Sequence, residues 1–410
     1  MTLVQHPPPF PGYKVYHRGS VYLVLPSALV DRMMDPKDPW YWLGDTTPTK
    51  STPPSEGVQS RQPPAGPHPF SGDLAAAFDW PQKGRVDPTQ QHVVLRGTEV
   101  ERVTNRTASE RDSDVQRADK NILEKLCEAG PLRTIANPGS KPRTWALAVE
   151  RLHRAHPHFD AVTDFVVGRV TLSEYSTQPL QIPPIHLWGE PGLGKTHYAN
   201  DLAQALGAPL RRQSMDNAQS GSLLLGSERY WSNAAHGVIF DQVCMGTHAN
   251  PIILLDELDK APTDARYSPT APLHSLLEPV TSRCVRDAAM DIEFDASLVT
   301  YIATSNDPTL VPASLRSRFR EFHIEPPMGA QALDVAHVIT LRALDRMNIP
   351  AFEPPIQALS RKLAHLTARE IHQVVQDAVA KAMQNGRCYL TFADLPADLL
   401  DGFSNENVLH

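Results

Sequence analysis

The segment that most constrains this chain is an octapeptide with the pattern GxxxxGK[ST]. It follows a short apolar run at 185–188 and opens a helical pattern. In such a loop the glycines let backbone N–H groups curl around phosphate oxygens, and the helix N-terminus adds partial positive charge. We therefore expect a strand, a phosphate-binding loop and a helix in succession. The loop consists of Gly189, Glu190, Pro191, Gly192, Leu193, Gly194, Lys195 and Thr196.

Individual residues of this segment have predicted roles. We expect Lys195 to reach the β- and γ-phosphates of a nucleotide and Thr196 to ligate Mg²⁺. His197, the next residue of the helical pattern, is expected to contact the nucleotide together with the loop. The cofactors predicted from the sequence are therefore ATP and Mg²⁺.

A second segment of the same site is the apolar run 252–255, which ends in Asp256 and Glu257. An acid pair after a strand is common, but its position downstream of a phosphate loop makes it informative. We expect Asp256 to hold Mg²⁺ through water, and Glu257 to polarise the water that attacks the γ-phosphate.

Two more polar segments follow along the chain. The run 299–306 ends on Asn306, which we expect to orient the attacking water; the alternative is a turn-forming Asn before Asp307-Pro308. The stretch 311–320 then supplies three arginines at two-residue spacing, among them Arg316 and Arg318. In an oligomer one of them could reach the γ-phosphate of a neighbouring subunit. Spacing alone does not decide which.

Short apolar runs alternate with helical patterns after residue 180, which predicts a parallel α/β sheet covered on both faces. The stretch 330–400 is mostly helical and forms a smaller unit. The expected strands are 185–188, 209–212, 252–255, 298–303 and 319–324. The expected parts are an N-terminal element at 1–46, an irregular linker at 47–118, a helical lead-in at 119–180, the α/β domain at 181–327, the helical lid at 328–402 and a tail at 403–410.

The N-terminal part is rich in proline, which disfavours long helices and central strands. Residues 47–72 have the composition of an extended linker. Ahead of them, residues 13–26 predict two short strands around Arg18-Gly19. The cluster Trp40-Tyr41-Trp42 is either the core of a small β-rich element or a docking patch for a partner.

Bulk composition narrows the class of protein. A net charge of −7 argues against a general electrostatic grip on nucleic acid. The 4 cysteines form no CxxC pair, which is typical of reduced thiols. Because no signal-peptide core and no long apolar run is present, we expect a soluble, cytoplasmic protein without a membrane partner. His153, His156 and His158 lie close in sequence, but no Cys or carboxylate completes a metal site at ligand spacing.

Taken together, these segments resemble the AAA+ superfamily, and within it the ATPase module of Lon-type proteases, over about residues 145–400. The resemblance implies a P-loop NTPase sheet followed by a helical lid, in a homo-oligomeric ring that we expect to be a hexamer. Within the family a Pro-Leu-x-x-Arg-hydrophobic segment carries the arginine finger, which places the finger on Arg318. The stretch 368–371 resembles the sensor-2 segment, so Arg369 is expected to touch the γ-phosphate of its own subunit.

Other stretches resemble the family in part. Residues 225–237 match the segment whose aromatic residue lines the central pore, with Trp231 at that position and Tyr230 beside it; the alternative is a pair of half-buried aromatics. Residues 276–278 and 291–295 resemble the helix and hairpin that precede the sensor Asn. His156 to Phe159 occupies the place of the adenine-side segment but differs from it. About ten residues follow Leu400, so we expect no Ser–Lys protease domain and no protease activity.

The leading functional hypothesis is a Mg²⁺-dependent, chaperone-like ATPase that remodels or translocates protein, with the N-terminal region recruiting the substrate or partner. One alternative is an assembly or scaffold ATPase that does not thread protein. Another is a DNA-associated ATPase, which the acidity of the chain disfavours.

Overall fold

The computed structural model describes residues 13–17, 20–24, 87–109, 114–218, 220–229, 234–262 and 268–401. The chain divides into two units, Met1–Asp73 and Leu74–His410. In the first, β1 (Tyr13–His17) pairs antiparallel with β2 (Ser20–Val24), and these are the two strands predicted there. The aromatic cluster 40–42 and the stretch 47–72 lie outside the described residues.

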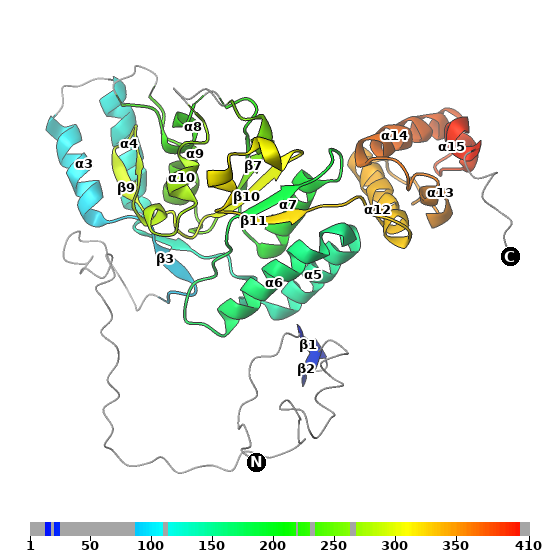
Figure 1. The fold of residues 1–410 in the computed structure, drawn as a ribbon, viewed down its shortest axis with the longest axis horizontal. Helices are drawn as coiled ribbons and strands as arrows, with labels where there is room; N and C mark the ends of the chain where they lie inside the picture. The colour runs from blue at the N-terminus through cyan, green and yellow to red at the C-terminus, as the bar shows by residue number, and fades with distance from the viewer. Residues whose placement is uncertain are drawn as a thin grey trace, which may run out of the picture. The chain divides into compact units, whose positions relative to one another are not determined.

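A five-stranded parallel sheet forms the centre of the second unit, with strand order β11-β5-β10-β7-β6 (Figure 1). Every residue of β7 and β10 is buried. Successive side chains of a strand point to opposite faces, so the sheet is covered on both, as the sequence predicts. Predicted and observed ends differ by up to two residues. The strands are β5 (Ile185–Trp188), β6 (Leu210–Ser214), β7 (Ile252–Asp256), β10 (Thr300–Ser305) and β11 (Arg320–His323).

Three long helices pack beside this sheet. α7 (Lys195–Leu206) contacts β7 and β10, α5 (Pro142–Ala155) contacts α7, and α6 (Asp160–Glu174) contacts α5. On α5 the buried side chains are Trp145, Val149 and Leu152, which form one apolar stripe at helical spacing. The lead-in to the sheet is therefore helical, as expected.

The boundary at residue 118 is wrong, because the ordered fold begins earlier. β3 (Gln91–Val93) pairs with β4 (Leu132–Thr134), and α3 (Gly97–Ser109) packs against α4 (Asp114–Ala129). Val100 and Val103 lie one turn apart on α3 and are fully buried. Part of the predicted linker 47–118 thus belongs to the core, since its apolar residues follow a helical spacing that the prolines upstream obscured.

Shorter elements complete the large domain. β8 (Val285–Asp287) and β9 (Ile292–Phe294) form an antiparallel hairpin after α10 (Leu273–Leu276), at the places where the sequence predicts a helix and a hairpin. The remaining short helices are α8 (Ser222–Leu225), α9 (Val238–Phe240), a π-helical turn at Asp241–Met245 and α11 (Ala313–Arg316). The 3-10 turns are Pro138–Ser140, Pro157–Phe159, Leu258–Lys260, Thr281–Cys284, Pro308–Leu310 and Phe392–Asp394.

The lid has an apolar core of its own, built from Leu359, Ile371, Val375, Val379 and their neighbours. Its helices are α12 (Ala330–Met347), α13 (Gln357–Arg361), α14 (Ala368–Gln384) and α15 (Ala397–Asp401). Helix α12 contacts α5 of the large domain. No helix in the described part of the chain is both long and apolar enough to cross a membrane.

Candidate nucleotide site

The loop between β5 and α7 has a backbone that requires glycine. Gly192 and Gly194 have φ values of 86° and 84°, in the left-handed region that favours glycine. A Cβ on Gly189 would lie 2.3 Å from the carbonyl oxygen of Ile324. Helix α7 begins at Lys195, directly after the loop, so the predicted order of strand, loop and helix is confirmed.

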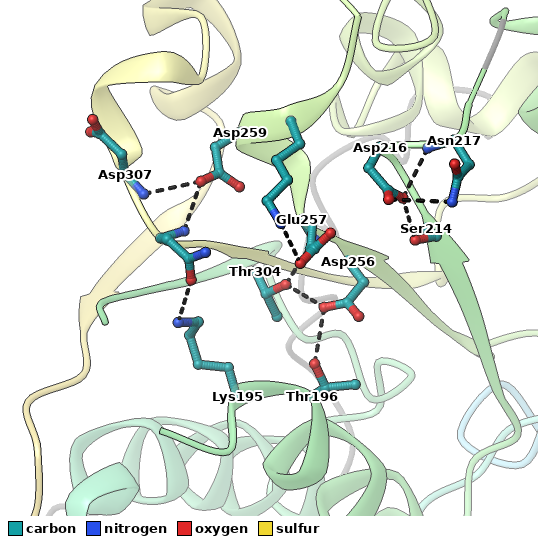
Figure 2. A network of polar contacts seen from close by, with 12 residues as sticks. Lys195, Thr196, Ser214, Asp216, Asn217, Asp256, Glu257, Asp259, Thr304 and Asp307 are labelled. Carbon is teal, nitrogen blue, oxygen red and sulfur yellow. Dashed lines mark hydrogen bonds and ion pairs between the residues drawn. The ribbon is translucent and has the colours of Figure 1, made fainter. Parts of the chain in front are cut away.

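Lys195 is almost buried and points into this loop. Its Nζ donates to the carbonyl oxygens of Gly189 at 2.7 Å and Glu190 at 2.8 Å. It also donates to Oδ1 of Asn306 at 3.1 Å, which is the dashed contact drawn from Lys195 in Figure 2. Burial lowers the pKa of Lys195, and the carboxylates of Asp259 and Asp256 oppose that shift. The structure thus places the ammonium group of Lys195 among three oxygen atoms at the carboxyl end of the strands.

Asp256 ends β7 and meets Thr196 across the site (Figure 2). The Thr196 hydroxyl donates to Oδ1 of Asp256 at 3.0 Å, and the Thr304 hydroxyl donates to the same oxygen at 2.5 Å. Arg212 occupies the other carboxylate oxygen, with Nε 2.7 Å from Oδ2. The two predicted Mg²⁺ ligands are therefore neighbours.

Glu257 follows Asp256 and has a φ of 57°, rare for a residue with a side chain. Its N–H donates to the Thr304 hydroxyl at 3.0 Å, which fixes the backbone at this strained position. Its carboxylate accepts from Lys260 Nζ at 2.7 Å. The side chain is 36% exposed, so solvent reaches the carboxylate that the sequence assigns as the base.

The backbone at Asn306 is held by the carboxylate of Asp259. The N–H groups of Asn306 and Asp307 donate to Oδ2 of Asp259 at 2.9 and 3.1 Å (Figure 2). The turn role belongs to Asp307, which accepts from the N–H of Thr309 and begins the 3-10 turn Pro308–Leu310. Asn306 instead directs its side chain at Lys195, which favours the predicted sensor over the turn-forming alternative.

The arginines before β11 differ in their contacts. Arg316 forms two hydrogen bonds with Glu321, from Nε to Oε1 at 2.7 Å and from Nη2 to Oε2 at 2.9 Å. Arg320 lies over the ring of Phe322 at 5.9 Å. Arg318 donates to the Ser314 carbonyl, and its Nε lies 3.8 Å from Oε2 of Glu278. Arg316 is thus committed to its own chain more firmly than Arg318.

The lid approaches the phosphate loop from the other side. A cleft of about 310 Å³ is lined by the loop, α12 and the start of α14, and includes His158, His197 and Arg342. Thr367 lies against Gly192, since a Cβ on that glycine would be 3.3 Å from Cβ of Thr367. Arg369 is exposed two residues further on and does not line the cleft. His197 does, with Nε2 3.2 Å from Nη2 of Arg346.

The histidines near residue 156 have separate partners. His153 lies 2.7 Å from Asp160, His156 lies 2.6 Å from Asp201, and His158 lies 2.9 Å from the carbonyl of Leu193. Among the described residues, no group of three or more His, Cys, Asp or Glu could hold a metal ion. The predicted pore residues Tyr230 and Trp231 lie outside the described residues.

Sequence reasoning missed Arg212 and Asp259, which hold predicted site residues in place. Arg212 lies beside Leu254 in the pairing of β6 with β7, within reach of the end of β7. An arginine on an otherwise plain strand carries no motif, so only the register of parallel strands could have indicated it. Asp259 was visible as a third acid after the pair Asp256-Glu257, but its role depends on the turn that follows.

The segment that carries this site is similar in sequence to known proteins. Residues 185–326 match the ATPase family associated with various cellular activities (AAA). A Lon protease of Elusimicrobium minutum is 34% identical over 171 residues, which is 42% of this chain and 20% of that protein. The chain contains an AAA domain that is similar to Lon proteases. Lon protease 2 of Thermus thermophilus is 28% identical over 276 residues, covering 62% of this chain and 34% of that protein.

The AAA+ module has the parallel sheet and phosphate loop of a P-loop NTPase. A mutant RuvB of Thermotoga maritima aligns with 57% of this chain and 67% of its own, at 16% identity and a TM-score of 0.40. The chain spans between about a fifth and a third of the length of these two Lon proteases. The match with the Lon proteases therefore concerns the ATPase module rather than a whole protease.

Proposed function

We propose that this AAA+ module hydrolyses ATP with Mg²⁺. The observation that carries the proposal is the meeting of Lys195, Thr196, Asp256 and Asn306 at the carboxyl ends of β5, β7 and β10. In a parallel α/β sheet, ligands bind at this end of the strands. The site has a cation for phosphate, oxygen atoms for a metal and an acid beside them.

The residues present fit a magnesium nucleotide. The hydroxyl of Thr196 and the carboxylate of Asp256 are hard oxygen donors only 3.0 Å apart. Bound Mg²⁺ would neutralise phosphate charge and polarise the γ-phosphate. The glycine loop offers backbone N–H groups to the phosphates, and Lys195 offers its ammonium.

Glu257 and Asn306 prepare the attacking water. Glu257 accepts a proton from the water once its carboxylate turns from Lys260, to which it is bonded at 2.7 Å. Asn306 orients the water, since Asp259 fixes its backbone and leaves its amide toward Lys195. Arg369 is proposed to reach the γ-phosphate from the lid when the lid closes on the loop.

The test is phosphate release from ATP by the purified chain with and without Mg²⁺. Lys195→Ala should reduce turnover more than about 100-fold, because it removes the charge that meets the phosphates. Lys141→Ala, at an exposed position before α5, is the matched control and should retain full turnover. A folded chain that releases no phosphate in the presence of Mg²⁺ would refute the proposal.

We infer that the working form is a homo-oligomeric ring, a hexamer in the Lon-like arrangement. Arg318 has no contact with Lys195 or Asp256 among the contacts of the described residues, and it is less engaged than Arg316. This supports Arg318 as a finger that enters a neighbour's site. Arg318→Ala chains should be inactive alone and recover turnover when mixed with Lys195→Ala chains. Inactive mixed oligomers would point to Arg316 or to a role within one chain.

The proposed task of the ring is to remodel or translocate protein, with the N-terminal region as the recruiting part. The support is the likeness to Lon proteases over the module. An unfolded protein should stimulate ATP turnover, and Trp231→Ala should reduce the stimulation but not the basal rate. Indifference to unfolded protein would favour a scaffold ATPase, and stimulation by DNA with a steep salt dependence would favour a DNA-associated one.

A further inference from the structure

A row of polar side chains crosses three strands of the sheet, from the half-buried Glu321 to two fully buried groups. Glu321 on β11 lies opposite His186 on β5, and Ser305 ends the neighbouring strand β10. His186 Nε2 is 2.7 Å from the Ser305 hydroxyl, and Nδ1 is 3.2 Å from Oε1 of Glu321. His186 is 0% exposed and Ser305 is 1% exposed. The row begins on the edge strand β11 and runs inward, and buried polar groups are unusual in a parallel sheet, where strands are normally apolar.

The row has the composition of a nucleophilic triad, but it cannot act as one. A serine, a histidine and a carboxylate at hydrogen-bond distance form the arrangement of many hydrolases. Here the serine and the histidine are both buried, so no substrate reaches the hydroxyl. Its role must lie in what its two ends hold.

One end of the row holds the sensor. Ser305 is followed directly by Asn306, whose side chain accepts from Lys195. The other end contacts the turn that carries Arg318. Arg316 donates two hydrogen bonds to Glu321, and Arg318 lies two residues after Arg316 in the chain. The ring of Phe319 lies 5.8 Å from the ring of His186, so the residue after Arg318 also lies beside this histidine.

Hydrogen-bond chemistry assigns the proton in the row. Arg316 lowers the pKa of Glu321, so this carboxylate is ionised and can only accept. His186 therefore donates from Nδ1 to Glu321 and accepts at Nε2 from the Ser305 hydroxyl. Burial lowers the pKa of His186, which keeps the ring neutral with one donor and one acceptor. Each group in the row has its partner, so removing one side chain would leave its neighbour without a hydrogen bond.

We propose that His186 is a positioning residue that couples the nucleotide sensor Asn306 of one site to the finger Arg318, which serves the next site. The inference rests on the proposed function, because it needs a finger that acts on a neighbouring chain. Because His186 is fully buried, its side chain would not touch a bound nucleotide. It sets the distance between Asn306, at the end of β10, and the turn before β11 that carries Arg318.

The test introduces His186→Leu either into the chain that supplies the finger or into the chain that supplies the nucleotide site. Lys195→Ala chains supply fingers, Arg318→Ala chains supply sites, and their mixture provides the reference turnover. His186→Leu is then added to the first chain or to the second. A coupling residue predicts a fall of roughly 10- to 100-fold in both placements, because either partner is then misplaced. A fall in one placement only, or in neither, would overturn the proposal.

Further readouts separate coupling from damage to the fold. Nucleotide affinity and oligomer mass should stay within about twofold of the reference, since His186 contacts no nucleotide. His186→Gln should restore most of the turnover, because an amide keeps one donor and one acceptor. Ser360→Ala is the matched control: Ser360 is a fully buried serine whose hydroxyl lies 3.0 Å from Nδ1 of His337, in the lid. It should leave turnover unchanged.

Three further outcomes decide the proposal if a variant or the reference fails. If the leucine chain does not assemble, Ser305→Ala takes its place in both positions, and it should lower turnover in both. Failure of His186→Gln to restore turnover would overturn the proposal. A reference mixture without any recovered turnover would refute the shared site itself, and the inference with it.

Discussion

At the scale of single residues, Asp256 is the most constrained group of the site. Thr196 and Thr304 donate to one of its oxygens, and Arg212 occupies the other. Arg212 keeps the carboxylate oriented, but its positive charge also opposes a divalent cation beside the same group. Position and charge therefore act in opposite directions on the affinity of the site for Mg²⁺.

We expect Arg212→Met to lower the free Mg²⁺ concentration at half-maximal turnover by about 2- to 10-fold, because a competing cation is removed. The side chain is 57% exposed, so solvent screening limits the effect. Turnover should be titrated with Mg²⁺ at constant ATP. Arg211→Met, at the exposed neighbouring position on β6, should leave the midpoint unchanged. An unchanged midpoint in Arg212→Met would show that the ion pair does not oppose the metal.

Glu257→Gln should bind ATP but hydrolyse it at least about 100-fold more slowly, since an amide cannot take the proton of the attacking water. Nucleotide binding at equilibrium and phosphate release in a single turnover separate the two effects. Asp241→Asn, at an exposed acid of the π-helical turn, is the matched control and should hydrolyse ATP normally. Normal hydrolysis in Glu257→Gln would assign the base to another residue.

At the scale of elements, the lid depends on a few polar contacts around its apolar core. Thr367 and Glu370 form a capping box that starts α14 next to the phosphate loop. Arg387, after α14, binds both oxygens of Asp394 at 2.6 and 2.7 Å. The Asp394 carboxylate also accepts from the N–H of Thr391 at 2.8 Å. The end of the lid is thus fixed by one buried acid.

Asp394→Asn should lower the stability of the lid by about 2 kcal/mol at neutral pH, since it weakens charge-assisted hydrogen bonds. The hydrogen bonds from Arg387 hold the pKa of Asp394 well below its usual range. The contribution is therefore complete above about pH 4 and is lost as the pH falls through the lower, folded value. Thermal unfolding should show a gap between wild type and variant that narrows below pH 4.

Asp398→Asn, at an exposed position of α15, is the control for this gap. It should unfold like the wild type at every pH. A gap for Asp394→Asn that stays constant, or widens, as the pH falls would contradict the assigned role of the ion pair.

The strands and the loop could be predicted from sequence because each is a local pattern. All five expected strands are present, and the phosphate loop lies where its glycines require it. Arg212, Asp259 and His186 could not be predicted, because their roles arise from the order of strands in the sheet. The elements β3 and α3 were missed because a short strand and one helix carry a weaker signal than the prolines before them.

At the scale of the whole molecule, one chain supplies only part of the proposed ATPase site. Lys195, Asp256, Glu257 and Asn306 meet in one place, whereas Arg318 lies on a separate turn after β10. Hydrolysis should therefore depend on association between chains. The row through His186 gives a physical route by which one site would report to the next.

The most direct measurement is ATP turnover per chain as a function of protein concentration, with the mass of the particles determined in the same samples. We expect turnover per chain to fall on dilution together with the loss of oligomers, and to stay low at every concentration in Arg318→Ala. Monomers that hydrolyse ATP at the full rate per chain would contradict a site shared between subunits.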